Sequence, residues 1–105
     1  MRFMRIIVFF DLPVTEKEER KEASQFRQAL IKDGYHMMQF SVYSRICSSV
    51  EACEKHIRRL HSYIPKDGSI RALVVTEKQY EKMYVLLGSI TYKDEAEEAF
   101  EPLVF

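Results

Sequence analysis

The sequence has few of the residues that build several common kinds of site. Its 105 residues include two cysteines, three glycines and three prolines. It also lacks an apolar run of the roughly 18 or more residues that a membrane-spanning helix needs, so we expect no transmembrane segment. The first residues show none of the regions of a secretory signal, and we therefore expect a cytoplasmic protein.

The scarcity of cysteine, glycine and paired histidine excludes several kinds of active site. The spacing of Cys47 and Cys53 fits neither a C-x-x-C pair nor a zinc ligand set, so we expect two reduced thiols. With so few glycines the chain has no G-x-G-x-x-G sequence, no P-loop and no G-x-S-x-G sequence. His56 and His61 lack the spacing that places two ligands on one helix face.

The charges balance over the whole chain, but they are unevenly distributed. Lys and Arg number 16, as do Asp and Glu. Basic residues are in excess up to residue 75, and acidic residues are in excess after it, concentrated in DEAEEAFE at 94–101. We interpret this as a mildly basic body with an acidic tail, which is either a solvated segment or one that docks elsewhere and screens the basic surface.

Hydrophobic periodicity and capping patterns predict one α+β domain over residues 1–105. Thr15 with Glu18, and Ser48 with Glu51, form capping boxes that place the starts of two helices. The predicted elements are a strand at 4–11, a helix at 16–33, a bent strand or hairpin at 36–46, a helix at 48–63, and strands at 69–75, 84–88 and 100–105, with a turn or helical turn at 76–83. This pattern favours a ferredoxin-like sandwich of βαββαβ type with an extra C-terminal strand.

The first predicted strand is apolar on both of its faces. Two helices cover only one face of a sheet, so Ile7 and Phe9, with Tyr43 on the neighbouring strand, are expected on an uncovered face. An exposed apolar patch of this kind marks an interface. We therefore expect a homodimer that forms through the sheet faces, with Ile7, Phe9 and Tyr43 in the interface.

The same strand ends on a carboxylate, in IIVFFDLP at 6–13. Asp11 either forms a turn ahead of Leu12 and Pro13 or holds a hard divalent cation such as Mg²⁺, which often takes only one or two protein carboxylates. A polar strip follows on 39–45, and arginines elsewhere offer phosphate contacts, although the pattern does not say which of them bind.

Three stretches carry a resemblance to a known family. They are the apolar strand ending in Asp11, the helix ending in KDGY at 32–35, and QFSVYSR at 39–45. Together they resemble the small CRISPR-associated endoribonucleases, the second of the two core spacer-acquisition proteins, in a variant similar to those of type II systems. The resemblance extends over nearly the whole chain.

The resemblance implies a specific set of properties. Asp11 would be the catalytic residue and Mg²⁺ ligand of a metal-dependent endonuclease, cleaving RNA or double-stranded DNA. The hypothesis of a nuclease, apart from the resemblance, assigns nucleic-acid contacts to Arg20, Ser41 and Arg45. Residues 89–105 would form an acidic linker and a strand that packs on the partner subunit of a homodimer. In spacer acquisition that dimer would bridge integrase subunits and support DNA.

Two other functions stay open from the residues alone. One is a scaffold that binds nucleic acid without cleaving it, since one carboxylate per chain is a thin ligand set and no general base is evident. The other is a ferredoxin-like domain that binds a small regulatory ligand. Phe10 also departs from the resemblance, because many members have Tyr before the aspartate, and its missing hydroxyl removes any polar role there.

Overall fold

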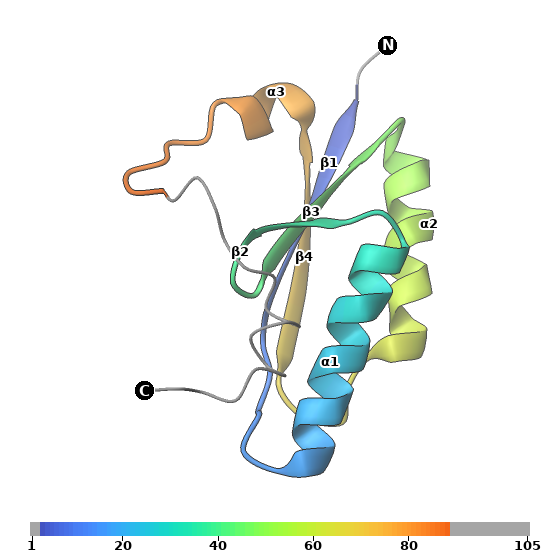
Figure 1. Ribbon diagram of the computed structural model, residues 1–105. Coiled ribbons are helices and arrows are strands. Elements are labelled where there is room, and N and C mark those ends of the chain that lie inside the picture. The colour runs from blue at the N-terminus through green and yellow to red at the C-terminus, as the bar shows by residue number, and fades with distance from the viewer. Residues whose placement is uncertain (1–2, 89–105) are drawn as a thin grey trace.

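The structure is a computed structural model that describes residues 3–88. Within them, a four-stranded antiparallel sheet carries two long helices on one face (Figure 1). The elements, in order, are β1 (Met4–Asp11), α1 (Lys17–Lys32), β2 (His36–Gln39), β3 (Val42–Cys47), α2 (Val50–Leu60), the 3₁₀ turn η1 (His61–Tyr63), β4 (Ser69–Thr76) and α3 (Glu77–Glu81).

The order of strands in the sheet is β2-β3-β1-β4, and each neighbouring pair is antiparallel. With the chain order βαββαβ, this is the ferredoxin-like arrangement that the sequence predicts. The segment 36–46 is a hairpin whose two strands are joined by a turn at Phe40 and Ser41. Ser41 has a φ of 65°, which is unusual for a residue other than glycine.

Both long helices begin one residue later than the capping patterns predict. The N-cap of α1 is Glu16, whose N–H donates to Glu19 Oε1 at 2.8 Å, so the capping box is not Thr15 with Glu18. The N-cap of α2 is Ser49, whose Oγ accepts from the Ala52 N–H at 3.1 Å. In each case the next residue along also carries a side-chain acceptor, so the sequence offers two registers for the same cap.

The core lies between the sheet and the two helices. Ile6 and Val8 of β1 are fully buried, as are Phe26 and Leu30 of α1. The ring of Phe10 packs edge-to-face on Phe26, with centroids 5.2 Å apart. Burying one side chain of this size contributes about 1.5–3 kcal/mol, so this covered face is a major source of the stability of the fold.

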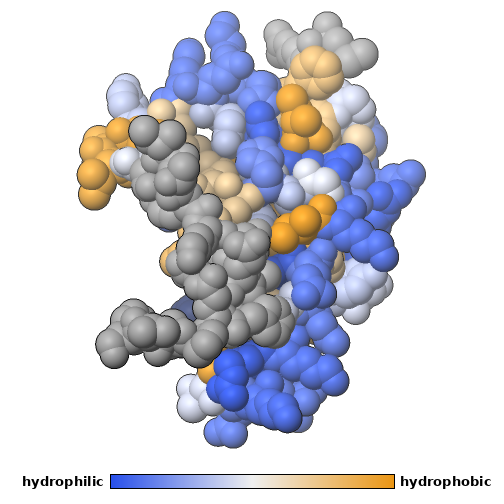
Figure 2. Space-filling model, viewed as in Figure 1, coloured by the Kyte–Doolittle hydropathy of each residue, from blue (hydrophilic) through white to orange (hydrophobic). Residues whose placement is uncertain are grey.

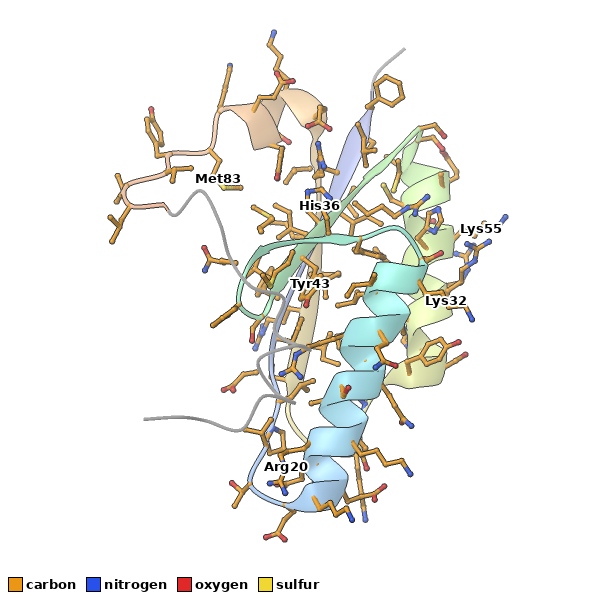
Figure 3. All side chains as sticks on the ribbon, viewed as in Figure 1. Arg20, Lys32, His36, Tyr43, Lys55 and Met83 are labelled. Carbon is orange, nitrogen blue, oxygen red and sulfur yellow. The ribbon has the colours of Figure 1, made fainter. Side chains whose placement is uncertain are left out.

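The prediction that Tyr43 lies on the uncovered face is wrong. Tyr43 is fully buried, and its ring stacks on Phe10 at 5.8 Å, on the helix side of the sheet (Figure 3). The alternation within β3 is intact, but its faces are reversed relative to the prediction. The more apolar Val42 and Ile46 lie opposite Phe9 and Arg5 on the uncovered face, whereas Tyr43 and Arg45 lie on the helix side. In β3 it is therefore Tyr43, paired with Val8, that faces the core.

The opposite face of the sheet keeps apolar side chains at its surface, as predicted for Ile7 and Phe9. Phe9 is 37% exposed and Ile7 is partly buried. Ile46 of β3 and Leu73 of β4 are also exposed, and they lie across from Arg5 and Ile7 of β1. We call Ile7, Phe9, Ile46 and Leu73 the open face.

The strand predicted at 84–88 is absent. After α3 the chain leaves the sheet as an irregular segment, and Leu86 and Leu87 are almost fully exposed. Figure 2 shows the apolar residues of this segment as an orange group at the left edge. The predicted strand at 100–105 and the acidic linker from residue 89 lie outside the described residues. No helix between residues 3 and 88 is long and apolar enough to cross a membrane.

Candidate functional site

Asp11 is the last residue of β1, and it is exposed. It pairs with Ser69, the first residue of β4, so the carboxylate stands at the end of the sheet. The turn before β4 passes closely over this point, because a Cβ on Gly68 would lie 2.7 Å from the Asp11 carbonyl oxygen. Gly68 also has a φ of +112°, so glycine is needed there for both space and backbone conformation.

Ser41 lies at the same end of the sheet as Asp11. Its carbonyl oxygen accepts a hydrogen bond from the N–H of Phe10 at 3.0 Å, so the turn between β2 and β3 adjoins the last two residues of β1. The left-handed backbone of Ser41 costs energy in a residue with a Cβ. The fold thus brings together two of the predicted site residues, which are distant in the sequence.

Arg20 stabilises the loop that follows Asp11. Its Nη1 donates to the carbonyl oxygens of Thr15 at 2.7 Å and Val14 at 3.2 Å. In Figure 3 Arg20 is labelled at the end of α1 that adjoins this loop. The guanidinium has five N–H donors, and these contacts use Nη1, so further donors remain for a phosphate.

Acidic side chains surround the far side of the same loop. A groove of about 190 Å³ is lined there by Leu12, Pro13, Pro65, Lys66 and five carboxylates: Glu16, Glu18, Glu19, Glu22 and Asp67. Two of the carboxylates already accept backbone hydrogen bonds: Glu19 from Glu16, and Glu22 from Lys66 at 2.8 Å. The excess of negative charge makes this groove unfavourable for a phosphate backbone.

Arg45 lies away from Asp11, on the helix side of the sheet. It pairs with Ile6, and its Nη1 donates to the carbonyl oxygen of Asp33, just past the end of α1. This contact needs Gly34, because a Cβ at that position would collide with the guanidinium. The sequence places Arg45 in a solvent-facing strip, whereas the structure assigns it to the end of a helix, where a cation offsets the helix dipole.

A cluster of charged side chains at the end of α1 has no counterpart among the sequence-based predictions. The carboxylate of Asp33 contacts His56 Nδ1 at 2.9 Å through Oδ2, and it accepts from Arg59 Nη1 at 3.0 Å through Oδ1. His56 and Arg59 are one helical turn apart on α2, so a single carboxylate spans both. The only signal in the sequence is the basic run at 55–61, KHIRRLH.

The open face also contains two polar pairs. Arg5 Nη2 donates to Glu77 Oε1 at 2.7 Å, and the Arg5 guanidinium lies 4.1 Å from the ring centre of Tyr80. Beside them, Ser44 Oγ lies 3.2 Å from His36 Nε2. Burial lowers the pKa of His36, and the nearby Arg5 charge lowers it further, while Glu77 acts in the opposite direction.

The donor set for a metal is small in one chain. Among residues 3–88 no group of three or more His, Cys, Asp and Glu side chains converges as metal ligands do. Asp11 by itself offers the carboxylate oxygen that Mg²⁺ prefers. The chemistry of this donor fits a magnesium site with one or two protein carboxylates, completed by water or phosphate, if a second copy of Asp11 lies near.

Comparisons with known proteins agree with one another. The model of the CRISPR associated protein Cas2 family matches residues 4–83. A CRISPR-associated endoribonuclease Cas2 of Acidovorax ebreus is 44% identical over 97% of this chain and all of its own length. One of Campylobacter jejuni is 46% identical over 89% of this chain, which spans 65% of that relative's length.

A solved structure supports the fold. The crystal structure of a Cas2 protein superposes with a TM-score of 0.61, covering 88% of this chain and 95% of the other, at 18% sequence identity. At that identity the likeness concerns the fold alone. The family model and the relatives of 44–46% identity identify the family as well as the fold. They confirm the resemblance that the three sequence stretches indicate. This chain belongs to the Cas2 family of CRISPR-associated proteins.

Proposed function

We propose that the chain is a metal-dependent endonuclease of the CRISPR system, an endoribonuclease by analogy with its relatives, which acts as a homodimer. The observation that carries the proposal is the exposed carboxylate of Asp11 at the end of β1, next to the turn that contains Ser41. The relatives of 44–46% identity are named as endoribonucleases. Membership of this family leaves no support for the small-ligand regulatory domain.

The homodimer rests on the open face. Leu73 is 52% exposed and Ile46 is 44% exposed, on the strands that flank β1. An apolar surface on three adjacent strands is stabilised when a second sheet covers it. A two-fold pairing of these faces uses one patch on both copies and brings two copies of Asp11 into one assembly. Ile7 and Phe9 lie in this interface, and Tyr43 does not, because it is buried in the core of its own chain.

Each site residue then has a distinct role. The two Asp11 carboxylates would hold Mg²⁺, and the bound ion would supply positive charge to offset the negative charge of the scissile phosphate. Ser41 and Arg20 position the nucleic acid beside Asp11. Ser41 does so from the turn that is hydrogen-bonded to Phe10, and Arg20 does so with the N–H donors that its contacts to the loop do not use. Arg45 is tied to the end of α1, so it contributes indirectly, by fixing the backbone near Asp33.

We propose that this dimer is cytoplasmic and acts in spacer acquisition. There it bridges integrase subunits and supports double-stranded DNA. Two observations favour this non-catalytic role beside the nuclease role. First, each chain offers a metal only one carboxylate at the end of β1, and no three ligand side chains converge among residues 3–88. Second, the groove beyond Asp11 is lined by five carboxylates, so a bound duplex would lie on another surface of the dimer. The acidic segment 89–105, as a linker and strand on the partner subunit, is part of the same proposal.

The test compares Asp11→Asn with the unchanged protein on labelled RNA and on labelled duplex DNA, with Mg²⁺ and with EDTA. The matched control is Asp67→Asn, which removes a carboxylate from the neighbouring loop. We expect metal-dependent cleavage that disappears in Asp11→Asn and persists in Asp67→Asn. Cleavage that survives Asp11→Asn contradicts the nuclease site. Binding without cleavage in all three proteins leaves the scaffold role alone.

A further inference from the structure

A second groove lies on the helix layer, away from Asp11. It runs between the last turn of α1 and the end of α2, and its volume is about 380 Å³. Buried Ala29 and Leu60 give it an apolar floor. Lys32, Arg59 and Tyr63 stand along its rim, all of them exposed, with Tyr63 at 50%. The volume is within the range of sites for small ligands.

Arg59 is held in position at this rim. Its Nη1 donates to Asp33 Oδ1 at 3.0 Å, and the other oxygen of that carboxylate contacts His56 Nδ1 at 2.9 Å. The Arg59 side chain is still 49% exposed. One carboxylate is thus shared by two partners, while the guanidinium keeps donors for an outside ligand. A fixed guanidinium loses less freedom when it binds a phosphate than a free one does.

The surroundings of the groove are basic. The charged side chains that line it are Lys32, Arg59 and Asp33, and the Asp33 carboxylate is already engaged by Arg59 and His56, so the lining has an excess of positive charge. Figure 3 shows Lys32 on α1 and Lys55 on α2 on the same side of the molecule. This contrasts with the groove beside Asp11, which five carboxylates line. A phosphate approaching the helix layer is therefore attracted to this groove and repelled by the other.

We infer that this groove binds one nucleotide unit of a single-stranded nucleic acid. The base lies over the apolar floor and stacks on the ring of Tyr63, and the adjoining phosphate contacts Arg59 and Lys32. Aromatic rings beside cations are the usual means of binding single strands without reading their sequence. The inference rests on the proposed role in nucleic-acid chemistry, but it uses none of the residues of the Asp11 site.

The test measures binding of a fluorescent single-stranded oligonucleotide, a matched duplex and a nucleoside monophosphate by anisotropy and competition, using the full chain with EDTA. We expect Tyr63→Ala and Arg59→Gln each to weaken single-strand binding by about five- to tenfold, given the usual contribution of one stacked base. Duplex binding changes less, because paired bases cannot stack on Tyr63. Competition by the monophosphate alone shows whether one free nucleotide suffices.

Two variants serve as controls. Arg58→Gln removes the same charge one residue away, outside the groove, and Tyr63→Phe keeps the ring; both are expected to bind within about twofold of the unchanged protein. Equal losses of single-strand affinity in Arg58→Gln and Arg59→Gln would show that only the overall charge matters, and would overturn the inference. So would a Tyr63→Ala protein that unfolds normally and binds normally.

Cross-linking keeps the inference testable even if Tyr63→Ala does not fold. A single strand that contains 4-thiothymidine is irradiated with the unchanged protein, and the adducts are mapped after trypsin digestion. We expect an adduct on the peptide 60–66, LHSYIPK. Adducts only on other peptides contradict this groove while leaving the proposed function intact. A protein that binds neither single strands nor duplexes contradicts both.

Discussion

The two faces of the sheet are built from the same strands but differ in their surroundings. On the covered face, Ile6 and Val8 of β1 are fully buried under the helices. On the open face, the residues next to them in the same strand, Ile7 and Phe9, keep part of their surface exposed. A strand that needed only one core would alternate apolar with polar residues. The apolar side chains on both faces of β1 therefore indicate two packing interfaces: one within the chain, and one that the proposed homodimer would supply.

The largest expected effect comes from placing a charge on the open face. In a dimer of sheets, Leu73→Asp buries one unpaired carboxylate in each copy, and each costs about 3–5 kcal/mol, so the dimer is lost at micromolar concentration. Light scattering measures the mass. The control is Ala72→Asp. Ala72 precedes Leu73 in β4, pairs with Val8 on the other face, and is exposed at the edge of the sheet.

We expect the Ala72→Asp protein to remain dimeric. If Leu73→Asp is also dimeric and well folded, the open face is not the interface, and the contrast between the faces loses its functional meaning. If the unchanged protein is already a monomer at this concentration, the homodimer itself is contradicted.

The next effect concerns the covered face. Phe26→Ala removes a fully buried ring that packs on Phe10, and such truncations cost about 3–5 kcal/mol of unfolding free energy. Urea unfolding measures the loss. The matched variant is Phe9→Ala on the open face, whose ring is 37% exposed in one chain.

The concentration of protein separates the two rings. Phe26→Ala is expected to lose the same free energy at every concentration, because its contacts lie within the chain. Phe9→Ala is expected to lose more at high concentration, where the dimer forms. Losses of equal size with no dependence on concentration would show that both faces belong to one core.

The sequence was sufficient for the parts of this comparison that depend on local pattern. β1 was predicted with its observed bounds, and Ile7 and Phe9 were correctly placed on the uncovered face, because alternation in a regular strand fixes sidedness. Tyr43 was misplaced because the more apolar set in β3, Val42 and Ile46, was expected to face the helices, whereas in the structure that set lies on the uncovered face.

The candidate site was predictable only in part, because most of its contacts join segments that are distant in the sequence. Asp11 is recognisable because it ends an apolar strand, and the structure places it at an exposed sheet end. Its neighbours are set by pairing between distant segments: the contact of Ser41 with Phe10, and the approach of Gly68 to Asp11. The contact of Asp33 with His56 joins residues 23 positions apart, which no local spacing rule reveals.

A smaller effect is expected from the ion pair at the edge of the open face. Arg5 and Glu77 have only 13% and 19% of their side chains exposed, so Glu77→Gln leaves a largely buried guanidinium without its carboxylate. We expect a loss of about 1–3 kcal/mol in urea unfolding. Glu81→Gln, on the exposed side of α3, removes the same charge and is expected to have no measurable effect. Equal effects would show that α3 is not held by this pair.

The smallest effect is a dependence of stability on pH through His36. Its pKa is lowered from an ordinary value near 6.5 by burial and then by Arg5 of β1, while Glu77 of α3 opposes them; Ser44 of β3 is its hydrogen-bonding neighbour. Because the unfolded chain binds the proton more tightly, stability is full above pH 6.5 and falls as the pH drops below it. We expect His36→Gln to flatten this slope in unfolding measured between about pH 5 and 7, and exposed His61→Gln to leave it unchanged. If a second copy covers the open face, the pH dependence of stability is also smaller in the monomeric Leu73→Asp protein, because His36 is better solvated there. Identical pH dependence in the two proteins would place His36 outside the interface.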